Sequence, residues 1–162
     1  MITIYYTCKQ IYKEATNMTK KLELLNQLVA DLAVANVKFH NLHWNVVGER
    51  FKEVHVFAEE LYDMLFEQYD EVAERVKMIG EFPPAALSTY LEMTKIEELS
   101  DKDYTIKETL NYLLEDIQYL KGLAIEARNV SDEEGDFATV AMLEDIVGTY
   151  CKHDWFISQM LK

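Results

Sequence analysis

Hydrophobic side chains recur every three or four residues over four long stretches of the chain, which is the spacing of amphipathic α-helices. The first stretch covers residues 19–47, with regular apolar positions at Leu22, Leu25, Leu28, Leu32, Ala35, Phe39 and Leu42. Further apolar residues widen this stripe, namely Leu24, Val34, Val37 and Val46. A helix that is apolar over so much of its surface is expected to contact a second subunit as well as its own bundle.

Start and stop signals bound the other helices. The second covers residues 51–79, because Gly80 ends it and the two prolines that follow prevent its continuation. Thr105 and Glu108 form the signature of a capping box, so the third helix begins there and extends to about residue 129. The polar segment 131–136 interrupts the third helix and begins the fourth, which reaches about residue 161.

The lengths of the connections predict how the helices are arranged. Short connections after the first and third helices make their neighbours antiparallel. Residues 80–104, with a short helix expected near 85–91, can cross the roughly 40 Å length of the bundle and leave the second and third helices parallel. The sequence therefore predicts an all-α fold, a ferritin-like four-helix bundle with a long crossover, over residues 19–162. Residues 1–18 are expected to form an N-terminal extension or tail.

Composition and charge narrow the class of protein. The chain has 162 residues with only five Gly and two Pro, too few turn-forming residues for a many-stranded β-sheet protein. Its 29 acidic and 16 basic residues give a formal net charge of −13, which repels nucleic acid and attracts cations. Cys8 and Cys151 are far apart and predict neither a zinc site nor a disulfide framework. No apolar run is long enough to cross a membrane and no secretion signal is recognisable, so we expect a cytoplasmic protein.

The candidate metal ligands lie mainly on the second helix. A ferritin-like bundle usually holds iron internally through Glu-x-x-His pairs, and this sequence contains none. Instead, His55 with Glu59 and Asp70 with Glu74 form two pairs spaced by four residues, all on one side of the helix. Imidazole nitrogen with carboxylate oxygen suits Fe(II), Mn(II) or Zn(II). Because Glu59 and Asp70 are about 16 Å apart along the helix, one metal centre cannot use both pairs.

Two copies of the helix can complete a site that one copy cannot. If the helix packs antiparallel against itself across a two-fold axis, facing residue numbers have a constant sum. His55 with Glu74, and Glu59 with Asp70, both sum to 129. One placement therefore brings the two ligand pairs together twice in each dimer. His43, twelve residues before His55 with a reversal of the chain between them, can reach the same end of the site.

The same residues form a recognisable pattern. It comprises HNLHWNVVG at residues 40–48, Phe51, His55, EELYD at 59–63, DEVAER at 70–75 and Ile79–Gly80. This pattern resembles that of the Dps miniferritins, over roughly residues 19–161. The HxxHW-x3-G element together with the D-x2-AER element is specific to that family. The resemblance implies a hollow homo-dodecamer built from two-fold dimers, with di-iron ferroxidase sites at the dimer interfaces.

Residue by residue, the resemblance implies a ligand set that two subunits share. The implied metal ligands are His43, His55 and Glu59 of one subunit with Asp70 and Glu74 of its partner. The family usually has Asp where this chain has Glu59, which coordinates iron either directly or through a water. Trp44 matches the family tryptophan beside the site, as a packing residue or as a source of electrons for stray oxidants.

The implied activity is that of a ferroxidase. Fe(II) enters the shell, is oxidised at the dimer site preferentially by hydrogen peroxide, and is stored as Fe(III) mineral, which protects against oxidative stress. The acidic segment 132–136 corresponds to the part of the family that lines iron-entry pores, and Asp136 is its best match. An acidic pore attracts cations.

Two other functions compete with this one. The first is a DNA-compacting shell that acts through the N-terminal lysines Lys9, Lys13, Lys20 and Lys21. The strongly acidic body opposes DNA binding, and Met18 as the natural start would remove the tail from the argument. The second is a non-catalytic acidic helical assembly, which would show no iron oxidation.

Each candidate residue also has a purely structural interpretation. His55 with Glu59 can be a surface ion pair, and Asp70 with Glu74 part of a solvated face. The two remaining histidines are expected in structural positions: His40 beside or near the site, and His153 packed near Trp155.

Overall fold

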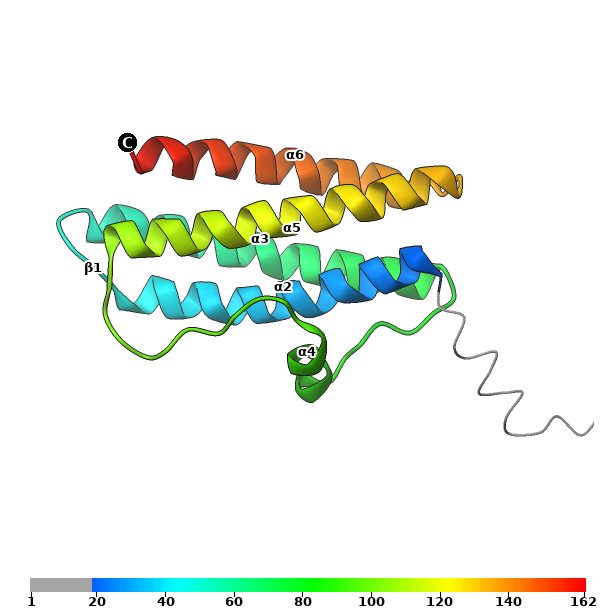
Figure 1. Ribbon diagram of the computed structural model, residues 1–162, viewed down its shortest axis with the longest axis horizontal. Coiled ribbons are helices and arrows are strands. Elements are labelled where there is room, and N and C mark those ends of the chain that lie inside the picture. Colours follow the sequence, from blue (N-terminus) through cyan, green and yellow to red (C-terminus); the bar gives the residue numbers. More distant parts are fainter. Residues whose placement is uncertain (1–18) are drawn as a thin grey trace, which may run out of the picture.

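The computed structural model describes residues 19–162, which form four long helices with one short helix between the second and the third (Figure 1). Their bounds are α2 (Lys20–Asn45), α3 (Phe51–Met78), α4 (Leu87–Met93), α5 (Ile106–Glu133) and α6 (Phe137–Met160). The prediction of an all-α four-helix bundle is confirmed. The predicted N-terminal extension, residues 1–18, lies outside the described residues. Within residues 19–162, no helix is both long and apolar enough to cross a membrane.

Side-chain caps fix where three of the long helices begin. Thr19 accepts a hydrogen bond from the backbone N–H three residues further on, at the start of α2. The predicted capping box at the start of α5 is confirmed, because Thr105 and Glu108 each accept a hydrogen bond from the other's backbone N–H. Asp136 caps α6 in the same manner as Thr19 caps α2. Each cap satisfies a backbone donor that the helix itself leaves free.

The third long helix extends further than the sequence predicted. α5 continues to Glu133, and Gly135, with a φ of +71°, ends the turn that follows. The Ser131 hydroxyl donates a hydrogen bond to the carbonyl of Ala127 within the helix, so this polar residue does not interrupt it. Residues 132 and 133 therefore end α5 and do not begin the fourth helix, which corrects the prediction.

Two very short strands pair between the end of α2 and the start of α5. β1 (Val46–Val47) and β2 (Tyr104–Thr105) are parallel, with Val46 opposite Tyr104. Strands of two residues leave no alternating pattern, and the sequence did not predict them. β2 directly precedes α5, and β1 comes just before α3, so both helices begin at the same end of the bundle (Figure 1). The predicted parallel course of the second and third long helices is confirmed.

The crossover, residues 79–103, is held against α2 by one buried carboxylate. Asp31 of α2 is fully buried and accepts hydrogen bonds from four donors: the Gln27 amide, the Thr94 hydroxyl, the Lys95 backbone N–H and the Tyr119 hydroxyl. These donors belong to α2, the crossover and α5. One carboxylate therefore fastens three segments of the chain.

The single chain accounts for much of the wide apolar surface of α2. Leu24, Val34 and Val46 are all buried within it, whereas Val37 is 63% exposed. The crossover helix α4 packs against α2. Leu24, Val34 and Val46 therefore need no second subunit to cover them, which corrects that part of the prediction of a subunit contact. Val37 remains available for such a contact.

A buried ion pair connects α2 with α5 inside the bundle. The ammonium of Lys38 lies 2.8 Å from Oδ2 of Asp116, and both residues are almost fully buried. Burial raises the pKa of Asp116 to about 6, although the Lys38 charge acts in the opposite direction. This interior carboxylate is thus already paired with a cation.

We predict that Asp31→Asn lowers the free energy of unfolding by about 3 kcal/mol, because the amide cannot accept all four hydrogen bonds and turns a donor toward other donors. Denaturant unfolding measures the loss, and hydrogen exchange should locate it in the crossover around Lys95. Glu92→Gln on the exposed face of α4 is the control, with an expected change within about 0.5 kcal/mol. Equal stability of the two variants would show that Asp31 does not fasten the crossover.

Candidate metal centre

The reversal of the chain between α2 and α3 places two histidines face to face. His43 lies in the last turn of α2, and His55 lies near the start of α3. Gly48 turns the chain between them with a φ of +137°, and a Cβ at this position would lie 3.0 Å from Cγ1 of Ile106. The two imidazole centroids are 3.6 Å apart and the ring planes are inclined by 22°. The glycine reversal therefore creates the histidine pair, His43 and His55.

Each imidazole of the histidine pair donates a hydrogen bond from Nδ1 to the backbone carbonyl of the other residue, and both distances are 2.8 Å. A carbonyl oxygen can only accept, so both Nδ1 atoms carry a hydrogen. In the neutral ring the lone pair is then on Nε2, which is free to bind a metal ion. His43 is 7% exposed and His55 is half-buried. The backbone therefore fixes the tautomer of both rings and leaves both Nε2 atoms available as candidate ligands.

Further aromatic rings pack beside the histidine pair. Tyr62 of α3 stands nearly perpendicular to His43, with the centroids 5.2 Å apart, and stacks on His40 at 3.7 Å. The Nδ1 atom of His40 lies 2.8 Å from the carbonyl of Asn36, and Trp44 lies 5.5 Å from the His40 ring. His40 thus has a structural position near the site. Trp44 is 67% exposed, and its ring contact among residues 19–162 is with His40.

Glu59 lies one helical turn beyond His55 and is exposed. The Tyr62 hydroxyl donates a hydrogen bond to Oε1 of Glu59 at 3.3 Å. Burial raises the pKa of Tyr62, and the negative charges of Glu59 and Asp63 act in the same direction. Sequence reasoning did not single out Tyr62, although its spacing of three residues from Glu59 was a signal that could have identified it.

The two remaining predicted ligands lie further along α3 and are exposed. We call the face of α3 that carries them the ligand stripe, and its members are His55, Glu59, Phe66, Asp70 and Glu74. Helical spacing keeps its two acid-bearing ends about 16 Å apart. In residues 19–162, no three His, Cys, Asp or Glu side chains gather where they could hold a metal ion. One chain therefore brings the two histidines together, leaves Asp70 and Glu74 apart from them, and does not add Glu59 to them as a third ligand.

Asp136, the candidate pore residue, is part of an ion-pair cluster. Its carboxylate lies 3.0 Å from the Lys21 ammonium and 2.7 Å from the Arg75 guanidinium. Burial alone would raise the pKa of Asp136, but hydrogen bonds from Thr139 and Lys21 outweigh burial and hold the pKa well below its usual value. The two cations offset its charge. These contacts give Asp136 a structural role, as a helix cap and ion-pair partner. Its role in iron entry stays a prediction.

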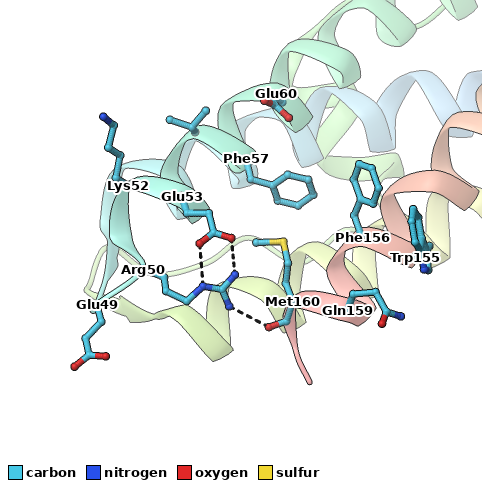
Figure 2. A pocket seen from close by; sticks show the side chains of 11 residues that line it. Glu49, Arg50, Lys52, Glu53, Phe57, Glu60, Trp155, Phe156, Gln159 and Met160 are labelled. Carbon is cyan, nitrogen blue, oxygen red and sulfur yellow. Dashed lines mark hydrogen bonds and ion pairs between the residues drawn. The ribbon is translucent and has the colours of Figure 1, made fainter.

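An open groove of about 890 Å³ lies between the start of α3 and the end of α6 (Figure 2). Phe57 and Phe156 form part of its wall, and Arg50 bridges Glu53 and the carbonyl of Met160 at its edge. The groove contains none of the five predicted ligands. The sequence did not indicate this groove.

His153 packs between α6 and α3. Its ring lies 6.0 Å from Phe57 and 6.2 Å from Phe156, and burial lowers its pKa. The structural interpretation of His153 fits this position, with these two phenylalanines as the contacting rings.

Known proteins are similar to this chain in both sequence and fold. The family model described as a ferritin-like domain matches residues 22–162. The DNA protection during starvation protein of Brevibacillus brevis is 39% identical over 86% of this chain and 93% of its own length. That of Helicobacter pylori is 33% identical over 88% of this chain and 99% of its own length. The crystal structure of a Dps protein from Bacillus brevis superposes with a TM-score of 0.83 at 37% identity, covering 90% of this chain and all of that one.

We predict that solid-state ¹⁵N NMR of histidine-labelled protein, at a pH where the imidazoles are neutral, shows hydrogen on Nδ1 of both His43 and His55. The reason is that each Nδ1 faces a carbonyl that can only accept. His153 is the internal reference, because its Nδ1 has no hydrogen-bond partner among residues 19–162 and its tautomer is not fixed in this way. Hydrogen on Nε2 of either member of the pair would contradict the reciprocal arrangement.

Proposed function

We propose that this chain, which belongs to the Dps family of ferritin-like proteins, oxidises Fe(II) at sites that two copies share and stores the Fe(III) product inside a hollow homo-dodecamer. Membership of the family makes it a protein of the iron-storage and DNA-protection class that counters oxidative stress. An oxidoreductase activity on iron follows in general terms from the same membership. The shared site, the preference for hydrogen peroxide and the twelve-subunit shell are the parts that we propose.

The histidine pair is the observation that carries the proposal. Its two Nε2 atoms are left free by the backbone hydrogen bonds, and Glu59 adds carboxylate oxygens one turn away. Nitrogen with carboxylate oxygen is a ligand set that suits Fe(II), and additional negative charge favours Fe(III). Iron is the substrate here, since it arrives as Fe(II) and leaves as Fe(III).

The proposed oxidation uses two electrons. Two Fe(II) ions at one site each give one electron to the same hydrogen peroxide molecule. With two protons taken up, the O–O bond breaks and two water molecules form, beside two Fe(III) ions. Because both electrons reach one peroxide, no hydroxyl radical is released. The residues of the site bind and orient the metal ions during this step.

The position of Phe66 supports a shared site. Phe66 is 61% exposed and lies in the middle of the ligand stripe, between Glu59 and Asp70. In the two-fold placement in which facing residue numbers sum to 129, the two copies of Phe66 are about 4.5 Å apart along the helix axis. An exposed phenylalanine at the centre of a polar face is explained by contact with its own copy. The same contact brings Asp70 and Glu74 opposite the partner's His55 and Glu59.

The competing functions receive less support. Of the four lysines expected to contact DNA, Lys20 pairs with Glu126 at 3.2 Å, and Lys21 pairs with Glu134 and Asp136. Lys9 and Lys13 lie outside the described residues. DNA binding through the N-terminal segment therefore stays an alternative, and a mobility shift at low salt with and without residues 1–18 tests it. No observation favours a non-catalytic acidic assembly.

We predict that subunits with His55→Ala and subunits with Asp70→Asn, each inactive alone in iron oxidation, recover activity when co-expressed in one shell. If each site takes its histidines from one chain and Asp70 from the other, a mixed dimer has one intact site, and random mixing restores about one quarter of the sites. Absorbance of Fe(III) after peroxide addition measures the recovery. Mixing His55→Ala with His43→Ala is the matched control, because both changes affect the same half-site and no intact site can form. Mixed shells no more active than this control would count against the shared site.

We also predict that Phe66→Glu produces particles of lower mass and loses iron oxidation, because apolar contact at the two-fold axis is replaced by two facing carboxylates. Phe66→Leu keeps an apolar side chain and should keep both properties. Native mass spectrometry reports the mass. A full-size, active shell of the Phe66→Glu variant would be incompatible with pairing along the ligand stripe.

A further inference from the structure

We propose that Tyr62 is a positioning residue, which holds the Glu59 carboxylate in place for the metal ion bound by His43 and His55. Its hydroxyl donates the hydrogen bond to Oε1 of Glu59 at 3.3 Å, which leaves Oε2 for the metal. The inference rests on the proposed function, because it presumes that the histidine pair binds iron. It adds a residue that controls one ligand of that site.

Tyr62 is held by contacts from α2 before any metal is bound. Its ring stacks on His40 at 3.7 Å and stands nearly perpendicular to His43 at 5.2 Å. Its backbone carbonyl accepts a hydrogen bond from the Asn36 amide at 2.6 Å. The direction of the hydroxyl is therefore set by the same helix that supplies His43. Tyr62 therefore contacts both His43 and Glu59 of the same chain.

Glu59 needs such a contact more than a shorter side chain would. It is exposed and has three rotatable side-chain bonds, so ordering it for coordination costs conformational entropy. Among residues 19–162, the Tyr62 hydroxyl is the donor that reaches its carboxylate. Aspartate at this position would be shorter by one methylene and would draw its oxygens back from Tyr62. The contact therefore depends on the length of the Glu59 side chain.

Partners that orient a metal ligand typically change metal affinity by about 10–100-fold. If the hydrogen bond from Tyr62 to Glu59 is only a surface contact without influence on the metal site, its loss would not change metal affinity. Removal of the Tyr62 hydroxyl alone, with the ring kept, distinguishes these two cases. Tyr62→Phe makes that change and preserves the ring contacts with His40 and His43.

The experiment is a titration of the assembled protein with Co(II), followed by its visible absorption and by calorimetry. Tyr62→Phe should weaken Co(II) binding about 10-fold and alter the absorption bands that report the ligand geometry. His55→Ala should lose binding at this site, and Tyr112→Phe, a tyrosine of α5 away from the site, should match the parent. Thermal unfolding checks that each variant is folded.

A second pair of proteins tests whether Tyr62 acts through Glu59. In a Glu59→Asp background, the further change Tyr62→Phe should alter Co(II) affinity by less than about 2-fold, because the shortened carboxylate no longer receives the hydroxyl. This comparison also excludes a general effect of the lost hydroxyl on the fold.

The outcomes separate this inference from the proposed function. If His55→Ala loses Co(II) binding but Tyr62→Phe binds like the parent, the positioning role is wrong and the metal site stands. A 10-fold loss in both backgrounds would also overturn the inference, because Tyr62 would then act independently of Glu59. If the parent and His55→Ala bind Co(II) equally, the histidine pair is not a metal site, and both proposals fall.

Discussion

Two hydrogen bonds between the end of α2 and the start of α3 determine the chemistry available to this chain. Each histidine of the pair donates Nδ1–H to the carbonyl of the other, so neither ring can turn without breaking a bond that the other residue's backbone provides. The exchange requires the close approach of the two helix ends, and Gly48 permits it. As a result, both rings are held in one tautomer, with Nε2 of each left without a backbone partner and available to a metal ion.

Within one chain, the other helices and the crossover leave the acidic residues and Phe66 of the ligand stripe exposed. Asp31 fastens the crossover to α2 and α5, and the crossover contacts α3 at Tyr69, a residue outside the ligand stripe, through the hydroxyl of Tyr90. In the bundle interior, Asp116 is paired with Lys38 and is not free to bind a cation. The exposed carboxylates of the ligand stripe and the exposed ring of Phe66 therefore lie on one open face. That face is polar at both ends and apolar in the middle, as expected of a surface that pairs with its own copy.

Much of this arrangement could be predicted from the sequence, because it follows from periodic patterns and short-range signals. The four long helices follow from apolar spacing, and the start of α5 follows from the Thr105–Glu108 capping box. The proximity of His43 to His55 was predicted from their twelve-residue spacing and the chain reversal between them. The length of α5 was not predicted, since Ser131 bonds to the backbone in a way that sequence does not reveal. The β1–β2 contact and the stacking of Tyr62 on His40 were not predicted either, because they join residues on different elements and leave no local pattern.

We propose that one iron site takes its ligands from two chains. The measurement that tests it most directly is anomalous X-ray diffraction, at the iron absorption edge, from crystals soaked anaerobically in a ferrous salt. A site shared by two chains predicts anomalous density next to Nε2 of His43 and His55, with Asp70 and Glu74 of a two-fold-related copy within coordination distance. Density bound by residues of a single chain, or copies whose ligand stripes face apart, would contradict it.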